Sequence, residues 1–347
     1  MNKKVTVVGS GVAGLCCAYT LLQADYQVEI ITASNGPDDQ CCSWWAGGML
    51  APFCEQETAE PLVEKLGLES MAFWQRFTAE QQLDYHANGS LVVAAPRDQA
   101  LLDQFAEQTH GARWLDAKQT AELEPDLAHL GRALLFADEA HMEPREVIKS
   151  LWLVCQQLGA KVHTNKRLSE EQIKQRAQQV DWLIDCRGLA ASESLPDLRG
   201  VKGEMLHLYC PDVELSRSIR LAHPRHPIYL VPRPDNVFML GATMLEVNDS
   251  RRATVRSVLD LLSAAYAINP AFAEAEIIEI GVDARPAFDD NLPKIKVSDN
   301  CIAANGLYRH GFLGAPALAR RILDYVKQGQ LCNEVFDCSE VLDANYA

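Results

Sequence analysis

Three glycines near the start of the chain have the type and spacing of a phosphate-binding loop. Gly9, Gly11 and Gly14 form the pattern G-x-G-x-x-G in VTVVGSGVAG, directly after a run of valines. In this pattern the first glycine permits a tight turn, the second lets a pyrophosphate approach backbone N–H groups, and the third lets helix and strand pack closely. The alternative is a glycine-rich turn without a ligand. The position between a strand and a helix favours dinucleotide binding along Gly9, Gly11, Val12, Ala13 and Gly14.

The end of the next strand departs from the usual dinucleotide pattern. An acidic residue there normally binds the adenosine ribose, but this strand ends in IITASN, with Thr32 and Ala33 at the expected positions. Glu29 comes too early in the strand to reach a ligand. Thr32 can supply a weaker hydrogen bond. No arginine follows that would bind a 2′-phosphate, so the pattern does not favour NADP.

The residues around the glycines predict the elements that would position the loop. The apolar run before Gly9 lacks alternation, which is typical of a buried parallel strand. The segment GVAGLCCAYTLLQAD continues at helical spacing, and QVEIIT predicts the next strand. Together these elements form one βαβ unit in about thirty residues.

The middle of the chain changes to the pattern of an antiparallel sheet. GEMLHLYC, HPIYLVPR and NVFMLGATM are strand-like, and RPDN between the last two is a turn signal. Helical patterns occupy residues 61–85, PREVIKSLWLVCQQLGA, ATVRSVLDLLSAAYAI and GFLGAPALARRILDYVKQG. The remaining apolar runs predict further strands: GSLVVAAP, KVHT, DWLIDCRG, EIIEIGVDARP and NCIAANG. This order predicts a mixed α/β (α+β) fold with interleaved lobes, in which the first and last segments share one sheet.

Composition and charge narrow the function classes. The net charge of −15 argues against nucleic acid as a partner, because phosphate binding needs clustered lysine and arginine. The eleven cysteines show no C-x-x-C or Cys/His metal spacing, so we expect no metal site. Cys16, Cys17, Cys155, Cys186 and Cys301 fall in apolar stretches, which indicates reduced core residues and a cytoplasmic protein. The first residues enter a strand directly, which indicates no signal peptide, and no apolar run is long enough to span a membrane.

A second cluster of small residues, CCSWWAGGMLAPFCE, follows the βαβ unit and would allow close approach of the backbone to a flat ring. With it the chain resembles the D-amino-acid oxidase superfamily of flavoproteins, and within that superfamily the glycine oxidases of thiamine biosynthesis. The resemblance covers nearly the whole length, and its motifs keep their order and spacing: VVGSGVAGL, AGGMLAP, DCRGLAA, VKGEM, IYLVPR, LGATM, GVDARP and NGLYRHGFLGAPALA.

The resemblance implies FAD, bound without a covalent link. The pyrophosphate would lie on the first glycine loop, with Thr32 replacing the usual ribose contact. By their positions in the matching motifs, ten further residues would contact the cofactor: Ser43, Ala46, Gly47, Gly48, Met49, Gly188, His310, Gly311, Phe312 and Leu313. The backbone of RHGFLG, at a helix N-terminus, would face flavin O2 and stabilise negative charge on the reduced ring.

The resemblance also implies the substrate contacts. Arg285 in GVDARPAF matches the arginine that binds the substrate α-carboxylate, a task for which a planar guanidinium is well suited. Its structural alternative is a salt bridge with Asp283, Asp289 or Asp290. Arg309 in LYRHGF matches a second active-site arginine, and Tyr229 in IYLVP matches a tyrosine that contacts substrate.

The expected reaction is FAD-dependent oxidation of glycine to iminoacetate, with O2 reduced to hydrogen peroxide. One alternative is the same flavin-dependent oxidation with D-alanine or sarcosine as the substrate. Another is an enzyme that passes the electrons to an acceptor other than O2. Two further hypotheses belong to other functional classes: a tRNA-modifying flavoprotein, and a flavin-binding scaffold without catalytic turnover. We expect a small amino acid and O2 as partners, neither nucleic acid nor membrane, and a possible homo-oligomer.

The order of the predicted elements divides the chain into two interleaved domains and a tail. Residues 1–55, 130–202 and 280–330 would form a Rossmann-like FAD-binding domain. Residues 56–129 and 203–279 would form a substrate-binding domain built on the antiparallel sheet, and residues 331–347 a peripheral tail.

Overall fold

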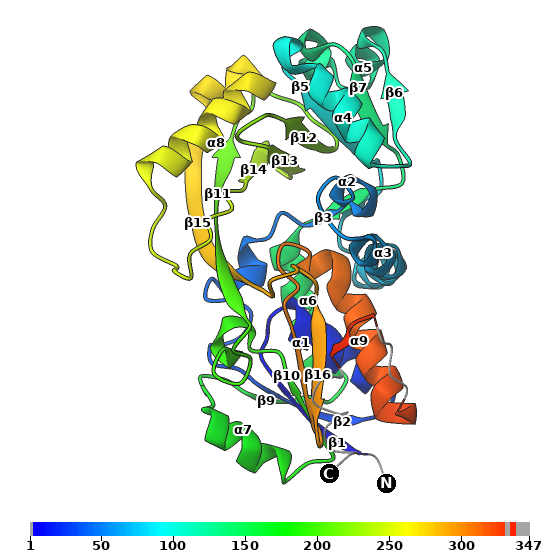
Figure 1. Cartoon of the computed structure of the whole chain (residues 1–347), viewed down its shortest axis with the longest axis vertical. Helices are drawn as coiled ribbons and strands as arrows, with labels where there is room; N and C mark the ends of the chain where they lie inside the picture. Colours follow the sequence, from blue (N-terminus) through cyan, green and yellow to red (C-terminus); the bar gives the residue numbers. More distant parts are fainter. Residues whose placement is uncertain (1–2, 330–333, 338–347) are drawn as a thin grey trace.

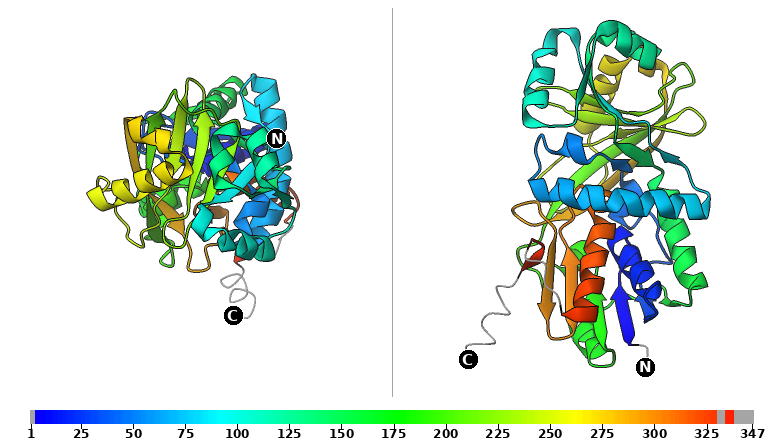
Figure 2. Two further views of the ribbon diagram at one scale, coloured as in Figure 1. Left: turned by 90° about the horizontal axis from the view of Figure 1, so that it is seen from above. Right: turned by 90° about the vertical axis from the view of Figure 1, so that its right-hand side faces the viewer.

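The computed structural model describes residues 3–329 and 334–337. Figure 1 shows two lobes stacked along the long axis of the molecule, each built around its own large sheet. The helix α3 (Pro61–Gln81) lies across the middle of the molecule, between the lobes, in the right-hand view of Figure 2. None of the helices in the described part of the chain combines the length and apolar character that a membrane span requires.

The lower lobe contains a seven-stranded sheet assembled from both ends of the chain. Its strands are, in spatial order, β18 (Phe336–Asp337), β16 (Lys294–Ser298), β17 (Cys301–Asn305), β10 (Trp182–Asp185), β1 (Lys4–Val8), β2 (Gln27–Ile31) and β9 (Lys161–His163). The strands from β17 to β9 are mutually parallel, and β16 pairs antiparallel with β17. The prediction that the first and last segments share one sheet is therefore confirmed.

Helices cover both faces of this sheet, which explains why β1 is apolar without alternation. Val5 and Val7 pack in one core with α1 (Val12–Leu22), α6 (Pro144–Gln157) and α9 (Gly311–Gln328). Val8 packs on the opposite face with residues of α7 (Glu170–Ala177). A parallel sheet buried on both faces is the arrangement expected of a dinucleotide-binding lobe.

The upper lobe contains an eight-stranded, mostly antiparallel sheet. Its spatial order is β15 (Glu276–Ala287), β11 (Arg199–Tyr209), β14 (Val237–Gly241), β13 (Ile228–Arg233), β12 (Ser218–Ala222), β5 (Ser90–Ala94), β7 (Ala133–Phe136) and β6 (Arg113–Leu115). Only β12 and β5 run parallel. The helix α8 (Val255–Ile268) covers one face, α4 (Ala100–Gln108) packs against β5, β7 and β12, and α5 (Ala117–Leu123) lies beside β6.

A small three-stranded sheet joins the lobes. It contains β3 (Met49–Leu50), β8 (Ala140–Met142) and β4 (Tyr85–His86), and the short helix α2 (Pro52–Glu55) follows β3 directly. In the neighbouring α3, the Trp74 Nε1–H donates to the carbonyl oxygen of Phe312 in α9 at 2.6 Å. This bond ties the bridging helix to the start of α9, where the cofactor segment is expected.

The predicted hairpin and the mixed fold class are confirmed, with corrections to local detail. β13 and β14 pair antiparallel, and Asp235 and Asn236 form the turn with positive φ. The helix expected to reach residue 85 ends at Gln81, because Gln82 is left-handed and Tyr85 begins β4.

The described part of residues 331–347, which the prediction places in a peripheral tail, packs on the lower lobe. Val335 and Phe336 are buried, and β18 pairs with β16. The remainder of the tail lies outside the described residues. The domain division stays a proposal, and β7 and most of β15, which it assigns to the FAD-binding domain, hydrogen-bond within the eight-stranded sheet.

The cysteines in the described part of the chain are all free thiols. Cys16, Cys17, Cys155 and Cys186 are buried in the core, as expected from their apolar surroundings. Cys301 is only half-buried, which corrects its assignment to the core, because it lies on β17 beside the short helix α7.

Candidate active site

The glycine loop has the geometry that a pyrophosphate site requires. Gly9 has φ +112°, and its N–H donates to the carbonyl oxygen of Ile31 at 2.9 Å. A Cβ on Gly14 would overlap the carbonyl oxygen of Gly9, so Gly14 allows α1 to pack against the loop rather than touching a ligand itself. Gly11 caps α1, whose N-terminal N–H groups carry partial positive charge toward the cavity.

The Thr32 hydroxyl lies at the end of β2, where the sequence has no acidic side chain. It is buried and lies 2.7 Å from Ser10 Oγ. Glu29 faces elsewhere: it forms an ion pair with Arg176 and contacts His163 Nε2 at 2.5 Å. The ribose region therefore offers hydroxyl groups instead of a carboxylate.

Two cations reach the same region from a distant segment. The N–H of Lys166 donates to the carbonyl oxygen of Thr32 at 2.8 Å, which brings Lys166 and Arg167 to the wall of the cavity beside Thr32. Neither residue was predicted, because the sequence directly after β2 contains no arginine. Positive charge beside Thr32 therefore comes from a segment far from β2 in the sequence.

Two adjoining cavities collect the predicted cofactor residues. The first contains the glycine loop, Thr32 and Gly188, and the second contains Ala46, Gly47, Gly48, Met49, His310, Phe312 and Leu313. Their common lining makes them one continuous cleft: Val12, Cys42, Ser43, Asp283, Tyr308 and Gly311. A long cleft with phosphate-binding N–H groups at one end and small residues at the other fits FAD. Of the predicted cofactor residues, only Gly14 lines neither cavity.

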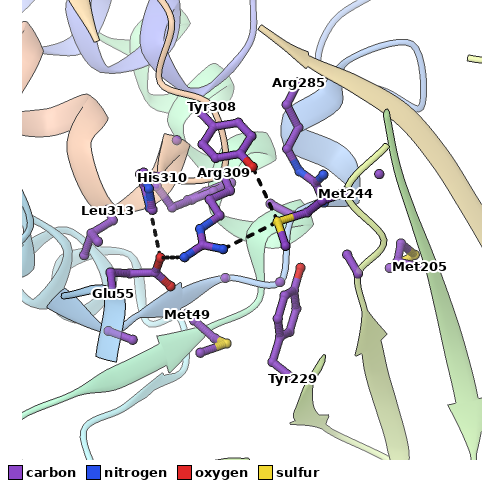
Figure 3. Close-up of a pocket in the computed structure, with 18 of the residues that line it drawn as sticks. Met49, Glu55, Met205, Tyr229, Met244, Arg285, Tyr308, Arg309, His310 and Leu313 are labelled. Carbon is purple, nitrogen blue, oxygen red and sulfur yellow. Dashed lines mark hydrogen bonds and ion pairs between the residues drawn. The ribbon is translucent and has the colours of Figure 1, made fainter. Parts of the chain in front are cut away.

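Arg285 lies on β15 with its guanidinium in the second cavity (Figure 3). Its Nη1–H donates to the carbonyl oxygen of Thr243 at 3.1 Å, and a Cβ on Gly203 would overlap the guanidinium. No carboxylate of residues 3–329 or 334–337 forms an ion pair with Arg285. Asp283, which lines the same cavity, instead accepts from the N–H of Ala284 at 2.8 Å. The Arg285 guanidinium is thus held in place by backbone and remains available to an anion.

Arg309 has a different environment from Arg285. Its Nη2 lies 2.6 Å from Glu55 Oε2 and donates to Thr58 Oγ1 at 2.6 Å, and its Nη1 contacts Met244 Sδ at 3.6 Å. Figure 3 shows the side chains of Glu55, Arg309 and Met244 in one row across the pocket. Arg309 is therefore already paired with a carboxylate of the protein.

Glu55 is the centre of this buried charge cluster. Arg220 Nη2 donates to Glu55 Oε1 at 2.5 Å, and His310 Nδ1 lies 3.5 Å from Glu55 Oε2. Burial opposes ionisation of Glu55, but the Arg309 and Arg220 cations hold the pKa of the carboxyl well below its usual range. Burial lowers the pKa of His310 to about 4, so its imidazole is neutral at pH 7. His310 precedes α9 as its N-cap residue.

Tyr229 comes from β13 and packs against two glycines. A Cβ on Gly47 or Gly241 would come within 3.0 Å of its ring. Figure 3 shows the Tyr229 hydroxyl pointing toward Met244. The three predicted substrate residues therefore line one pocket, although β13, β15 and the loop before α9 are far apart in sequence.

Sequence reasoning missed several residues of this pocket. Glu55, Arg220, Met244 and Tyr308 line it without belonging to a predicted site. Of these four residues, only Glu55 has a local sequence feature that could have indicated it: it is an acidic residue directly after the apolar MLAPFC segment. Arg220 lies in the middle of a strand, where only the assembled fold reveals its partner. Asp283 also lines the pocket, and burial raises its pKa to about 6.

Glu139 is a second buried carboxyl near Arg220, and its protonation can be tested through the stability of the protein. It accepts from the N–H of Cys54 at 2.7 Å, and burial raises its pKa to about 7 from an ordinary value of 4.5. Between these pH values the folded protein binds more protons than the unfolded chain, so stability falls as pH rises from about 4.5 to about 7. Glu139→Gln should remove this loss, which is on the order of 3 kcal/mol.

Urea denaturation of wild type and Glu139→Gln at pH 5 and pH 8 measures the difference. We expect the free energy of unfolding of the variant to change less between the two pH values. Asp138→Asn, at the exposed neighbouring position, is the matched control. An equal change in wild type and Glu139→Gln would contradict the assignment.

The chain belongs to the family of FAD dependent oxidoreductases, which it matches over residues 4–325. It is therefore an FAD-dependent oxidoreductase. Among curated relatives, it is 44% identical over 332 residues to a protein of Rhizobium etli named as the thiamine biosynthesis oxidoreductase ThiO, covering 94% of this chain and 98% of the relative. It is 24% identical over 352 residues to a glycine oxidase of Bacillus licheniformis, covering 92% of both chains.

Solved structures with the same fold include two amine-oxidising enzymes. The glycine oxidase of Geobacillus kaustophilus superposes with a TM-score of 0.81 at 22% identity, covering 97% of this chain and 98% of that one. The iminodiacetate oxidase of Chelativorans sp. BNC1 superposes with a TM-score of 0.78 at 25% identity, covering 94% and 96%. These likenesses confirm the predicted fold class.

Proposed function

We propose that this protein oxidises glycine to iminoacetate with reduction of O2 to hydrogen peroxide, and that the imine hydrolyses to glyoxylate and ammonia. The observation that carries the proposal is the contrast between the two arginines of the pocket. Arg285 has no carboxylate partner in the described chain, whereas Arg309 is paired with Glu55. One available guanidinium fits a substrate with one carboxylate.

FAD supplies the redox chemistry when bound, by accepting a hydride from the substrate α-carbon. We assign its contacts to the loop Gly9–Ala13, to Thr32 and Gly188, and to the segments that line the second cavity. The first turn of α9 begins at Gly311 and lines that cavity, so its N–H groups can stabilise negative charge near the ring. No covalent bond to the flavin is needed.

The protein's own residues orient the substrate. Arg285 would hold the carboxylate in a bidentate pair, and the Tyr229 hydroxyl would provide a second contact. The substrate amine must be neutral to release a hydride, but no strong base is required at the carbon. Arg309 would not bind the substrate directly. Its ion pair with Glu55 would hold the pocket wall that faces Arg285 in place.

The physiological role we propose is supply of the imine or its hydrolysis products to thiamine biosynthesis, and the support is the likeness to the Rhizobium etli protein. We place the reaction in the cytoplasm, which agrees with the free thiols of the described cysteines. O2 is the proposed electron acceptor.

A substrate panel with peroxide detection tests the assignment. We expect glycine to be turned over at least as efficiently as D-phenylalanine, because Tyr229 and Met244 restrict the space beside the α-carbon. D-Alanine and sarcosine test tolerance for one methyl group. A strong preference for bulky D-amino acids would reassign the enzyme to general D-amino-acid oxidation, and a preference for iminodiacetate would mean that Arg309 also binds substrate.

A further inference from the structure

One segment of the upper lobe, residues 242–254 between β14 and α8, carries both the backbone that holds Arg285 and part of the pocket wall. The carbonyl oxygen of Thr243 accepts from Arg285 Nη1 at 3.1 Å, and this is the one hydrogen bond of that guanidinium within the described chain. The next residue, Met244, lines the pocket, and its Sδ lies 3.6 Å from Arg309 Nη1. The position of the 242–254 segment therefore affects where the pocket can hold a carboxylate.

The 242–254 segment contains neither a helix nor a strand, so individual contacts must fix its position. Leu245 and Lys202 exchange two backbone hydrogen bonds, at 2.9 Å and 3.0 Å. The N–H of Thr243 donates to the carbonyl oxygen of Glu204 at 3.2 Å. These bonds attach the segment to β11, the strand that pairs with the Arg285 strand β15.

The side chain of Glu204 adds a second attachment at both ends of the segment. Glu204 is completely buried, and its Oε2 accepts from the Thr243 hydroxyl at 3.0 Å. Its Oε1 accepts from the N–H of Thr254 at 3.4 Å, directly before α8. The Thr243 hydroxyl also accepts from the N–H of Glu204 at 2.9 Å. The carboxylate thus fixes the peptide whose carbonyl oxygen contacts Arg285.

A buried lysine supplies the counterion of this carboxylate. Lys202 Nζ lies 3.4 Å from Glu204 Oε1 and 3.3 Å from Oδ1 of Asp249, within the 242–254 segment. Successive side chains of a strand point to opposite faces, so both lie on the face away from Gly203, where the Arg285 guanidinium lies. Desolvation offsets much of the attraction within such a buried pair, so net stability alone explains it poorly.

We propose that Glu204 is a positioning residue for the substrate carboxylate and acts through Thr243 on the guanidinium of Arg285. A bidentate ion pair needs the plane of the guanidinium in one orientation. Misplacing a binding group by about 1 Å can cost roughly a hundredfold in rate. The inference rests on the proposed function, because that function assigns Arg285 to the carboxylate of glycine.

Titration of the FAD-loaded protein with acetate tests this role without turnover. Acetate has the carboxylate of glycine and lacks the amine, and its binding is measured by the change in flavin absorbance. The dissociation constant should rise at least about tenfold in Thr243→Val and less than about threefold in Thr243→Ser, which restores the hydroxyl. KM for glycine should rise in parallel, and kcat should change less, because the carboxylate contact exists before and during the reaction.

Thr254→Val is the matched control for Thr243→Val. It removes a threonine hydroxyl from the same segment, but this hydroxyl accepts from the N–H of Ser257 at 3.2 Å and caps α8. We expect a lower melting temperature with wild-type acetate affinity and wild-type KM, because loss of a cap destabilises the helix without moving Arg285. The same pattern in Thr243→Val would mean that Thr243 has only a structural role.

Glu204→Gln, alone and combined with Thr243→Val, tests whether the two residues act through one contact. If they do, the double variant should bind acetate no more weakly than the weaker of the single variants. Independent effects would overturn the inference. Wild-type acetate affinity in Thr243→Val would also overturn it and leave the proposed function intact, provided that Arg285→Ala loses acetate binding. Wild-type affinity in Arg285→Ala would overturn both.

Discussion

Replacing Arg285 with alanine is expected to lower kcat/KM for glycine by roughly a hundredfold to several thousandfold, while the protein stays folded and loaded with FAD. The reason is that the substrate carboxylate would be left without a partner in a pocket that offers it one available guanidinium. Removing one member of a buried ion pair costs about 3–5 kcal/mol. Steady-state kinetics with peroxide detection, together with the flavin content, gives the measurement.

Two further variants make the Arg285 result specific. Arg285→Lys should recover only part of the activity, because a lysine cannot form the bidentate pair. Arg199→Ala is the matched control, since it removes an arginine from the neighbouring strand, where Arg199 pairs with Ala287. If Arg285→Ala keeps nearly the wild-type kcat/KM, Arg285 does not bind substrate and Arg309 becomes the candidate carboxylate partner.

Replacing Glu55 with glutamine should have the second largest effect. The variant leaves the buried Arg220 and the half-buried Arg309 cations without their common anion, so we expect the free energy of unfolding to fall by about 3 kcal/mol at pH 7. Because the folded pKa of Glu55 lies below its ordinary value, its stabilisation is complete above pH 4.5 and is lost only in acid. Urea denaturation at pH 7 measures the loss.

The same variant should also change substrate preference. Arg309 would lose its internal carboxylate, and a second substrate carboxylate could take that place, so the ratio of kcat/KM for iminodiacetate to that for glycine should rise. Glu57→Gln is the control, because Glu57 lies 4.0 Å from Arg220 and is partly exposed. Unchanged stability and unchanged preference in Glu55→Gln would show that the cluster neither stabilises the fold nor controls access to Arg309.

Sequence patterns predicted the parts of this site that depend on local geometry. Gly9 and Gly14 were identified because a tight turn and close helix packing demand glycine at fixed spacing, and the structure shows both constraints. Arg285, Arg309 and Tyr229 were identified by motif resemblance, and they line one pocket. Their roles in substrate binding stay predictions.

The parts that were missed depend on contacts between distant segments. Arg220 pairs with Glu55 across 165 residues, and no local pattern distinguishes it from any other strand arginine. Arg167 reaches the cavity wall beside Thr32 because the segment after β9 hydrogen-bonds to Thr32. Phe336 joins the lower sheet through β18, in a segment that the sequence analysis described only as a peripheral tail.

Anaerobic mixing of the purified protein with glycine tests the central claim most directly. We expect a yellow protein that releases FAD on acid denaturation. Glycine should bleach its flavin absorbance, with glyoxylate and ammonia formed in equal amounts. Admitting O2 should restore the colour and yield hydrogen peroxide. A flavin that stays oxidised with glycine but is bleached by another amine would contradict glycine oxidation, and a protein that binds no FAD would contradict the account of the cleft as a whole.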